Sequence, residues 1–325
     1  GRALAPFVDW DLADIVSGRA GTDWLDRVDV VQPVLWATSV ALAELWRAAG
    51  VEPDVVVGHS QGEVSAATVS GALSHEDAAR VVAMRSAAVR AIAGKGLMMA
   101  VELDPEAAQR SLEGFEDLVS VAVNNGPTSC VLSGEADSVL VLKELLEADG
   151  VDCRLVKVDY ASHSPQVDEV SAELLRDLAE VRPRQGRVPQ MSTVEVRHLA
   201  GEELDAEYWV ANLRRPVRFA ESVDALLDDG VTHVVEISAH PILTMALEAT
   251  AGERDADVSV LSTLRRDRGT VTDLARAFAR AYTAGLEPVA HMPDQAHTGL
   301  PPYPWQRTRY WVPEARRRTT GGTDL

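Results

Sequence analysis

Cysteine is nearly absent from this chain of 325 residues: Cys130 and Cys153 are the only two, and each falls in an apolar segment that predicts a strand. Such thiols argue against a disulfide and favour a reducing, cytoplasmic compartment. The eight histidines are scattered, and none stands near cysteine, aspartate or glutamate at a spacing typical of metal ligands. We therefore expect neither a disulfide nor a metal site.

Excess positive charge and long apolar runs are also missing. The formal net charge is −19 at pH 7, which would repel nucleic acids and anionic membranes, so neither is an expected partner. The acidic residues are scattered, as is typical of a solvated surface. We find no N-terminal signal and no apolar run that would span a bilayer, and therefore expect no membrane segment.

The length predicts two domains, or one large domain with an insertion. Residues 96–158 carry strand and helix patterns in the order βαββαβ, which is typical of a ferredoxin-like unit whose ends lie close together. We therefore predict an α/β fold: an α/β-hydrolase-like core with a parallel sheet, formed by residues 1–95 and 159–285, and an inserted ferredoxin-like subdomain. Because no strand pattern precedes residue 54, we expect an N-terminal strand of the sheet to be missing.

The pattern changes after residue 285. Residues 286–313 are rich in proline and aromatic residues and are expected to lie along a surface, since aromatic rings favour burial. Residues 314–325 are predicted to be disordered.

The most informative stretch is Gly58–Glu63, with the sequence Gly-His-Ser-Gln-Gly-Glu. It follows a short β-branched run and precedes a predicted helix, which is the setting of a G-x-S-x-G nucleophile elbow around Ser60. Gly58 and Gly62 are expected to remove side chains that would collide in the turn, and the helix start directs backbone N–H groups at an oxyanion. The alternative, a turn with a capping serine, is disfavoured by the flanking elements.

A serine nucleophile needs a base, and two histidines compete for this role. His163 ends the run Tyr160–His163 just before a helix start marked by Pro165, so it lies on a loop that can reach across a cleft. A surface histidine is the simpler interpretation of such a residue. His240 follows the strand predicted over 231–237, at the carboxyl edge where α/β sheets place their sites.

Arg85 occupies an apolar position of the helix that is predicted to follow the N-cap Ser74. A guanidinium group that faces inward must be paired, and its parallel donors suit a carboxylate. Two interpretations are open at this point: an internal ion pair with an aspartate or glutamate, or a site for the carboxylate of a ligand.

Separated motifs together resemble the acyltransferase domain of modular type I polyketide synthases. They are Arg27–Pro33, Gly58–Glu63, Tyr160–His163 and Leu300–Trp311. The resemblance extends over nearly the whole chain. It implies that residues 286–313 form a post-acyltransferase linker, and that the family's Gly-Gln-Gly-Ser-Gln strand, whose first glutamine helps to form the oxyanion hole, lies before residue 1.

The resemblance implies a mechanism without a bound cofactor. Ser60 would attack the thioester of an acyl-CoA with His163 as general base, and the acyl-serine would pass to the phosphopantetheine thiol of an acyl carrier protein. The N–H of Gln61 would contribute to the oxyanion hole, and Arg85 would bind the carboxylate of the extender unit. Backbone carbonyls would hold His163, and the loop from Ser238 to His240 is the candidate for that support.

The resemblance also implies a substrate. In this family, methylmalonyl selection is accompanied by three features of this sequence: the loop residues Tyr160, Ala161 and Ser162, the glutamine after the nucleophilic serine, Gln61, and the run that contains Gln32. Malonyl-selective relatives carry His-Ala-Phe-His in place of the loop. Small Ala161 and Ser162 would leave room for the α-methyl group. One methyl group discriminates by only about 1–3 kcal/mol, so we expect strong but incomplete selectivity.

The favoured function is therefore transfer of methylmalonyl from CoA to an acyl carrier protein in polyketide chain extension. The expected partners are methylmalonyl-CoA, the carrier protein, and the ketosynthase and linker domain of the same megasynthase. Two alternatives are a thioester hydrolase on the same fold, which would have little use for an inward Arg85, and a catalytically impaired structural fragment.

Overall fold

The computed structural model describes residues 1–288, 304–306 and 308. The chain divides into the units Gly1–Ala290 and His291–Leu325, and only the first is described below. The predicted disordered tail, 314–325, and most of the predicted linker, 286–313, lie outside the described residues.

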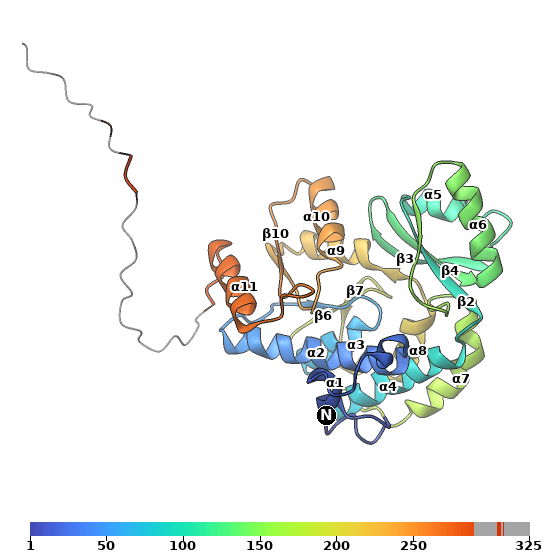
Figure 1. Cartoon of the computed structure of the whole chain (residues 1–325), viewed down its shortest axis with the longest axis horizontal. Coiled ribbons are helices and arrows are strands. Elements are labelled where there is room, and N and C mark those ends of the chain that lie inside the picture. Colours follow the sequence, from blue (N-terminus) through green and yellow to red (C-terminus); the bar gives the residue numbers. More distant parts are fainter. Residues whose placement is uncertain (289–303, 307, 309–325) are drawn as a thin grey trace, which may run out of the picture. The chain divides into compact units, whose positions relative to one another are not determined.

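The first part of the chain is helical and leads into the elbow (Figure 1). The helix expected after Ser74 begins there, because the Ser74 hydroxyl accepts a hydrogen bond from the Asp77 N–H at 3.0 Å. The elements are α1 (Leu12–Val16), η1 (Asp23–Asp26), α2 (Val28–Ala48), β1 (Val56–Val57), α3 (Gly62–Ser70) and α4 (His75–Ala91).

One of these helices overturns an expectation. Helix α2 has the length and the apolar composition that could cross a membrane, so the prediction that the sequence holds no such run is wrong. In this structure α2 packs against α3 and α4. Its Trp36 and Val40 are buried in the largest apolar cluster. The helix is apolar because one of its faces packs against the interior of the protein.

The next segment has the predicted order of elements, and its strands form an antiparallel sheet in the order β5-β2-β4-β3. Helices α5 and α6 lie on one side of this sheet (Figure 1). Strand β8, from later in the chain, pairs in parallel with β3, so this sheet is joined to the core. The elements are β2 (Gly96–Val101), α5 (Pro105–Arg110), β3 (Val119–Gly126), β4 (Ser129–Glu135), α6 (Ala136–Ala148) and β5 (Cys153–Leu155).

The remainder returns to alternating helices and strands. The elements are η2 (Pro165–Val167), α7 (Asp168–Asp177), β6 (Gln190–Ser192), β7 (Arg197–Leu199), η3 (Gly201–Glu203), α8 (Ala206–Arg214), β8 (Val217–Arg218), α9 (Phe219–Asp228), β9 (His233–Glu236), α10 (Thr244–Glu253), β10 (Ser259–Ser262) and α11 (Val271–Thr283).

The fold is mixed α/β, but the core strands do not form one continuous parallel sheet. Within the described residues, β1 pairs in parallel with β6, β7 is antiparallel to β6, and β9 and β10 form a separate parallel pair. No described strand pairs with the other edge of β1, so the preceding strand expected from the sequence stays a prediction.

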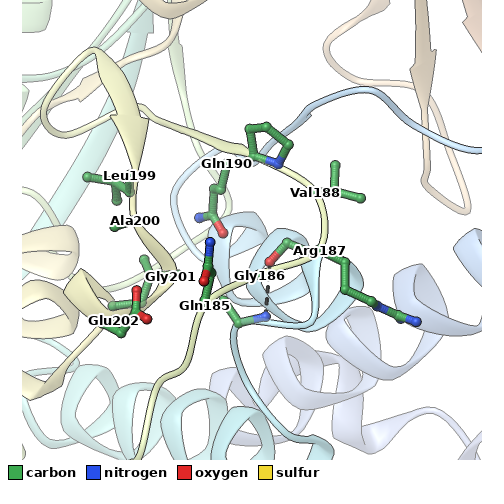
Figure 2. Close-up of a pocket in the computed structure, with 13 residues that line it drawn as sticks. Gln185, Gly186, Arg187, Val188, Gln190, Leu199, Ala200, Gly201 and Glu202 are labelled. Atoms are coloured by element: carbon green, nitrogen blue, oxygen red, sulfur yellow. Dashed lines mark hydrogen bonds between the residues drawn. The ribbon is translucent and has the colours of Figure 1, made fainter.

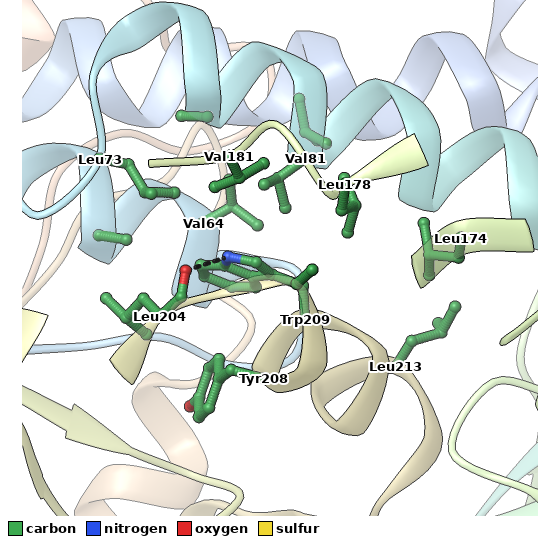
Figure 3. Close-up of a cluster of buried hydrophobic side chains, with 14 of the residues drawn as sticks. Val64, Leu73, Val81, Leu174, Leu178, Val181, Leu204, Tyr208, Trp209 and Leu213 are labelled. Carbon is green, nitrogen blue, oxygen red and sulfur yellow. Dashed lines mark hydrogen bonds between the residues drawn. The ribbon is translucent and has the colours of Figure 1, made fainter. Parts of the chain in front are cut away.

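The largest apolar cluster fixes helix α8. Trp209 is fully buried among leucine and valine side chains of α3, α4 and α7, and its indole N–H donates to the Leu204 carbonyl at 2.9 Å (Figure 3). A buried tryptophan with a satisfied N–H contributes a large apolar area. Helix α8 is thereby held against α4 and α7.

The sheet tolerates no side chain at Gly134. A Cβ atom there would lie 2.1 Å from the carbonyl oxygen of Leu118, the residue just before the neighbouring strand β3. We expect Gly134→Ala to lower the free energy of unfolding by roughly 1–3 kcal/mol. Gly252→Ala in α10 is the control, because a Cβ atom there meets nothing within 4 Å. Denaturant unfolding measures both, and equal stability of the two variants would contradict the proposed crowding.

Candidate active site

Ser60 sits in a tight turn between β1 and α3. Its φ angle is 52°, in the left-handed region that side chains seldom adopt, and the Glu63 N–H donates to its carbonyl at 3.0 Å. A strained strand-to-helix turn of this kind exposes the serine hydroxyl.

The two glycines of the turn differ in their surroundings. A Cβ atom at Gly58 would lie 2.2 Å from the Glu63 nitrogen, whereas one at Gly62 meets nothing within 4 Å. The prediction that both glycines avoid collisions is therefore wrong for Gly62.

Ser60 and His163 meet across more than a hundred residues of sequence. The serine Oγ lies 2.7 Å from His163 Nε2, and His163 is 2% exposed. On the other side of the ring, Nδ1 lies 2.8 Å from the Arg215 carbonyl oxygen. Because a carbonyl only accepts, Nδ1 carries the proton and Nε2 is free to accept from the serine hydroxyl.

The partner of His163 corrects one expectation. The loop from Ser238 to His240 does not support His163: the Ser238 hydroxyl donates to the His240 carbonyl at 2.9 Å, and His240 Nδ1 accepts from the Arg266 N–H at 3.2 Å. A backbone carbonyl does hold the ring, but it belongs to Arg215, just after α8. Main-chain acceptors exist at every residue, so no sequence signal marks this one.

Arg85 completes the cluster from helix α4. Its Nη2 donates to Ser60 Oγ at 3.0 Å, and its Nη1 donates to Gln32 Oε1 of α2 at 3.1 Å. The side chain is 1% exposed, and its Nε has no hydrogen-bond partner in the described part of the chain. Burial lowers the pKa of Arg85 to about 10, which leaves it charged at neutral pH.

No described acidic side chain forms an ion pair with the guanidinium group of Arg85. Among the described residues, the ion pairs closer than 4.0 Å do not include Arg85, so the internal ion pair considered from the sequence does not form. The guanidinium instead binds an amide oxygen and a hydroxyl, and leaves Nε without an acceptor. A buried cation with free donor capacity can bind an anion.

The loop before His163 is anchored on the antiparallel sheet. Ala161 is fully buried and Ser162 is 7% exposed. The Ser133 hydroxyl of β4 donates to the Ser162 carbonyl at 2.7 Å, and the Ser162 hydroxyl lies 3.4 Å from Met98 Sδ of β2. Tyr160 is half-buried, and burial raises the pKa of its hydroxyl. The loop is thus fixed between the sheet and the elbow.

Gln61 directly follows the serine and is the N-cap residue of α3. Its backbone N–H makes no hydrogen bond to any of the described residues, so it is available to a ligand near Ser60. Helix starts carry such free N–H groups together with a partial positive charge. The neighbouring His59 points elsewhere: its Nε2 lies 2.8 Å from Asn125 Oδ1 on β3.

The electrostatics of the site make His163 a neutral base. Burial is the largest cause that lowers its pKa to about 3, and the charge of Arg85 lowers it further, while the Arg215 carbonyl acts in the opposite direction. The imidazole is therefore uncharged at neutral pH, with a lone pair on Nε2 directed at the serine.

Besides the Arg215 carbonyl, the roles of three residues of the site were missed from the sequence. Asn212 of α8 donates to the Ser60 carbonyl at 3.4 Å, and Leu213 accepts from the His163 N–H at 2.9 Å. Both lie in the run Tyr208–Leu213, whose aromatic residues are more typical of packing than of chemistry. The third, Glu63, is fully buried behind the elbow, and no feature of the sequence indicated its partners.

A separate cavity lies away from this cluster. It has a volume of about 340 Å³ and is lined by the end of α3, at Ser70, and by the loop 185–190 and residues 199–202 (Figure 2). Ser60 is at the opposite end of α3, and neither it nor His163 lines this cavity. Groups of three or more potential metal ligands are absent from the described residues.

The sequence and the fold both match known proteins. The family model for the acyl transferase domain matches residues 1–288. The chain belongs to this family. Erythronolide synthase EryA2 of Saccharopolyspora erythraea is 46% identical over 97% of the chain, and the pikromycin synthase component PikAIII of Streptomyces venezuelae is 45% identical over 95%. The chain spans only 9% and 20% of these two relatives.

The fold of this acyl transferase domain is similar to solved structures of acyltransferases from polyketide synthases. The acyltransferase domain from module 8 of the salinomycin polyketide synthase is 46% identical, with a TM-score of 0.87 over 89% of this chain and 68% of that one. A loading acyltransferase from the avermectin synthase is 38% identical, with a TM-score of 0.83 over 86% of this chain and 89% of that one.

The elbow predicts different effects for its two glycines. Gly58→Ala should abolish reaction of Ser60 with a fluorophosphonate, because the added methyl group would collide with the backbone of Glu63. Gly62→Ala should react at close to the original rate, since its Cβ atom meets open space. Intact-protein mass spectrometry measures the adduct, and an unreactive Gly62→Ala variant that is folded would contradict this prediction.

The lowered pKa of His163 predicts an unusual pH profile. Because His163 stays neutral down to a pH of about 3, the rate at which Ser60 reacts with a fluorophosphonate should not fall as pH drops from 7.5 through 6.5 to 5. A loss of rate centred near pH 6.5, the value of a solvated histidine, would contradict the prediction.

The same pKa predicts acid lability. In the unfolded chain His163 binds its proton near pH 6.5, whereas the folded chain resists it until about pH 3. Protonation therefore favours unfolding in this window, and the contribution of His163 to stability is lost as pH falls from about 6.5 toward 3. Urea unfolding at pH 7 and pH 5 measures the free energy of unfolding of the unsubstituted chain and of His163→Gln. The difference between the two pH values should be smaller for His163→Gln.

Proposed function

We propose that this domain loads an extender unit, methylmalonyl, from CoA onto the phosphopantetheine thiol of an acyl carrier protein through an acyl-Ser60 intermediate. The observation that carries the proposal is that Ser60 Oγ lies within hydrogen-bond distance of both His163 Nε2, at 2.7 Å, and Arg85 Nη2, at 3.0 Å. A nucleophile, a base and a buried cation converge at one atom.

The first half-reaction transfers the acyl group to the enzyme. His163 Nε2 takes the Ser60 proton as Oγ attacks the thioester carbonyl carbon, and the N–H of Gln61 stabilises the oxyanion that forms. The intermediate then collapses: the C–S bond breaks, and the CoA sulfur leaves with the proton from His163. The Arg215 carbonyl holds the imidazolium during this step through Nδ1.

The second half-reaction reverses these roles. The phosphopantetheine thiol gives its proton to His163 and attacks the acyl-serine carbonyl, and the C–O bond to Ser60 breaks as Oγ recovers the proton. No net proton or electron is gained or lost. The chemistry is therefore ping-pong, and it depends on a Ser-His dyad without an acidic third member.

Arg85 supports an acidic extender unit over a neutral acyl chain. A malonyl-type group carries a free carboxylate, which would satisfy the unpartnered Nε and the charge of the guanidinium together. A hydrolase for neutral thioesters would pay the cost of this buried cation without using it. In the transferase, the same charge selects the substrate.

The α-methyl selection rests on the loop Tyr160–His163. Its small Ala161 and Ser162 are buried, and the Ser162 hydroxyl lies 3.4 Å from Met98 Sδ of the sheet. A phenylalanine in place of Ser162 would therefore have to displace the loop that carries His163. Gln32, which orients Arg85, is the other residue proposed for selection. Both features concern the space around the acyl group rather than the chemistry at the carbonyl.

A competition experiment tests the proposal. The purified chain is mixed with equimolar malonyl-, methylmalonyl-, ethylmalonyl- and acetyl-CoA, and adducts are read by intact-protein mass spectrometry. We expect a methylmalonyl adduct that is absent from Ser60→Ala. A malonyl adduct instead would contradict the selection argument alone, and the absence of any adduct on folded protein would favour a structural fragment. Release of free acid faster than transfer to a carrier protein would favour the hydrolase.

The carboxylate role of Arg85 has its own prediction. Arg85→Met should slow acylation by methylmalonyl-CoA at least about 30-fold, because truncating one partner of a buried charge pair is expected to cost about 2–5 kcal/mol. Acylation by acetyl-CoA, which lacks the carboxylate, should change much less. Arg90→Met on the same helix is the control, since Arg90 is exposed and pairs with Asp29 at the surface. Equal effects on both substrates would contradict the role.

A further inference from the structure

Helix α8 is bound both to the nucleophile and to the base. At its C-terminal end, Leu213 and Arg215 provide the two carbonyl groups that accept from the N–H and from Nδ1 of His163, at 2.9 and 2.8 Å. From the last turn, Asn212 Nδ2 donates to the Ser60 carbonyl at 3.4 Å. The position of α8 therefore sets the alignment of Ser60 with His163.

A buried carboxyl group ties the other end of α8 to the elbow helix. Glu63, in the first turn of α3, is fully buried, and its Oε2 accepts a short hydrogen bond from the Tyr208 hydroxyl of α8. Its Oε1 accepts from the Thr193 N–H at 2.9 Å and from the Thr193 hydroxyl. One side chain thus joins α3, α8 and the segment just after β6.

The geometry of α8 connects these two sets of contacts. Tyr208 and Asn212 are four residues apart, so they share one face of the helix. Trp209 leaves α8 on another side, toward the apolar cluster, as Figure 3 shows beside Tyr208. The Ser192 hydroxyl, 2.7 Å from the Tyr208 hydroxyl, completes the set of polar contacts at this position.

We propose that Glu63 and Tyr208 form a positioning pair that holds α8 against the elbow and thereby fixes the Ser60–His163 hydrogen bond. The pair touches neither the substrate nor the reacting atoms. Glu63 follows Ser60 by three positions in the elbow. From Tyr208, the chain leads through the last turn of α8 to the carbonyl groups that hold His163. This inference rests on the proposed function, because it concerns the alignment of the same dyad.

Tyr208→Phe is the first test, since it removes one hydroxyl group and keeps the ring in place. Ser60 is labelled with a fluorophosphonate, and intact-protein mass spectrometry follows both the rate constant and the final fraction of labelled chains. We expect the rate constant to fall roughly 10-fold while all folded chains still react, because a small misplacement of reacting groups lowers the rate. Tyr282→Phe is the matched control, since Tyr282 is 68% exposed.

A merely structural role would give a different result. It would lower the fraction of chains that react and leave the rate constant of the remainder unchanged, and this outcome would overturn the proposal. An unchanged rate constant with full labelling would overturn it as well. With methylmalonyl-CoA as substrate, the same variant should lower kcat and leave KM nearly unaltered, because the pair does not contact the acyl-CoA.

Glu63→Gln provides a second, independent variant. Its amide keeps the size of the side chain but cannot accept from both Tyr208 and Thr193, so we expect a smaller loss of rate. The double variant should be no slower than Tyr208→Phe alone, because both changes break the same contact between Glu63 and Tyr208. Additive losses of rate would overturn the proposed pair.

The fluorophosphonate separates this test from the proposed function. If it labels Ser60 while no acyl-CoA does, the transferase proposal fails and the positioning pair is still measured.

Discussion

The buried guanidinium of Arg85 is the constraint on which the site depends. A cation placed almost out of contact with water, without an acidic partner in contact, is unfavourable unless its donors are satisfied. Gln32 from α2 and Ser60 from the elbow supply two acceptors, so Arg85 holds three parts of the chain together. Its charge also adds to the burial that lowers the pKa of His163 and keeps the imidazole neutral.

A buried carboxyl group, that of Glu63, lies behind this cation. Glu63 does not touch Arg85, but the two act on each other through the interior: Arg85 favours the ionised form of Glu63, against the burial that raises its pKa, and Glu63 favours the charged form of Arg85. At low dielectric such forces act beyond contact distance. The site thus combines a donor left open for an anion with a carboxyl group already satisfied by Thr193 and Tyr208.

The sequence predicted the parts of the site whose side-chain type carries the signal. Ser60 follows from an elbow pattern, Arg85 from a charge on an apolar stripe, and the order of elements over 96–158 from periodicity. The carbonyl of Arg215 could not be predicted in this way, because a backbone group has no residue type, and the loop at Ser238 was a wrong choice for that reason. The split of the core strands into separate sheets depends on long-range pairing that no local pattern encodes.

On the proposed function, Arg85 would link the choice of substrate to the basicity of His163. In the structure its guanidinium group faces Ser60, and its charge adds to the burial that lowers the pKa of His163. On the proposed function, a bound carboxylate compensates that charge, so the pKa of His163 rises and Nε2 becomes a better proton acceptor just when an acidic extender unit is in place. A neutral acyl-CoA would leave the charge uncompensated and meet a weaker base. Selection and activation then follow from one ion pair, which only the correct class of substrate completes.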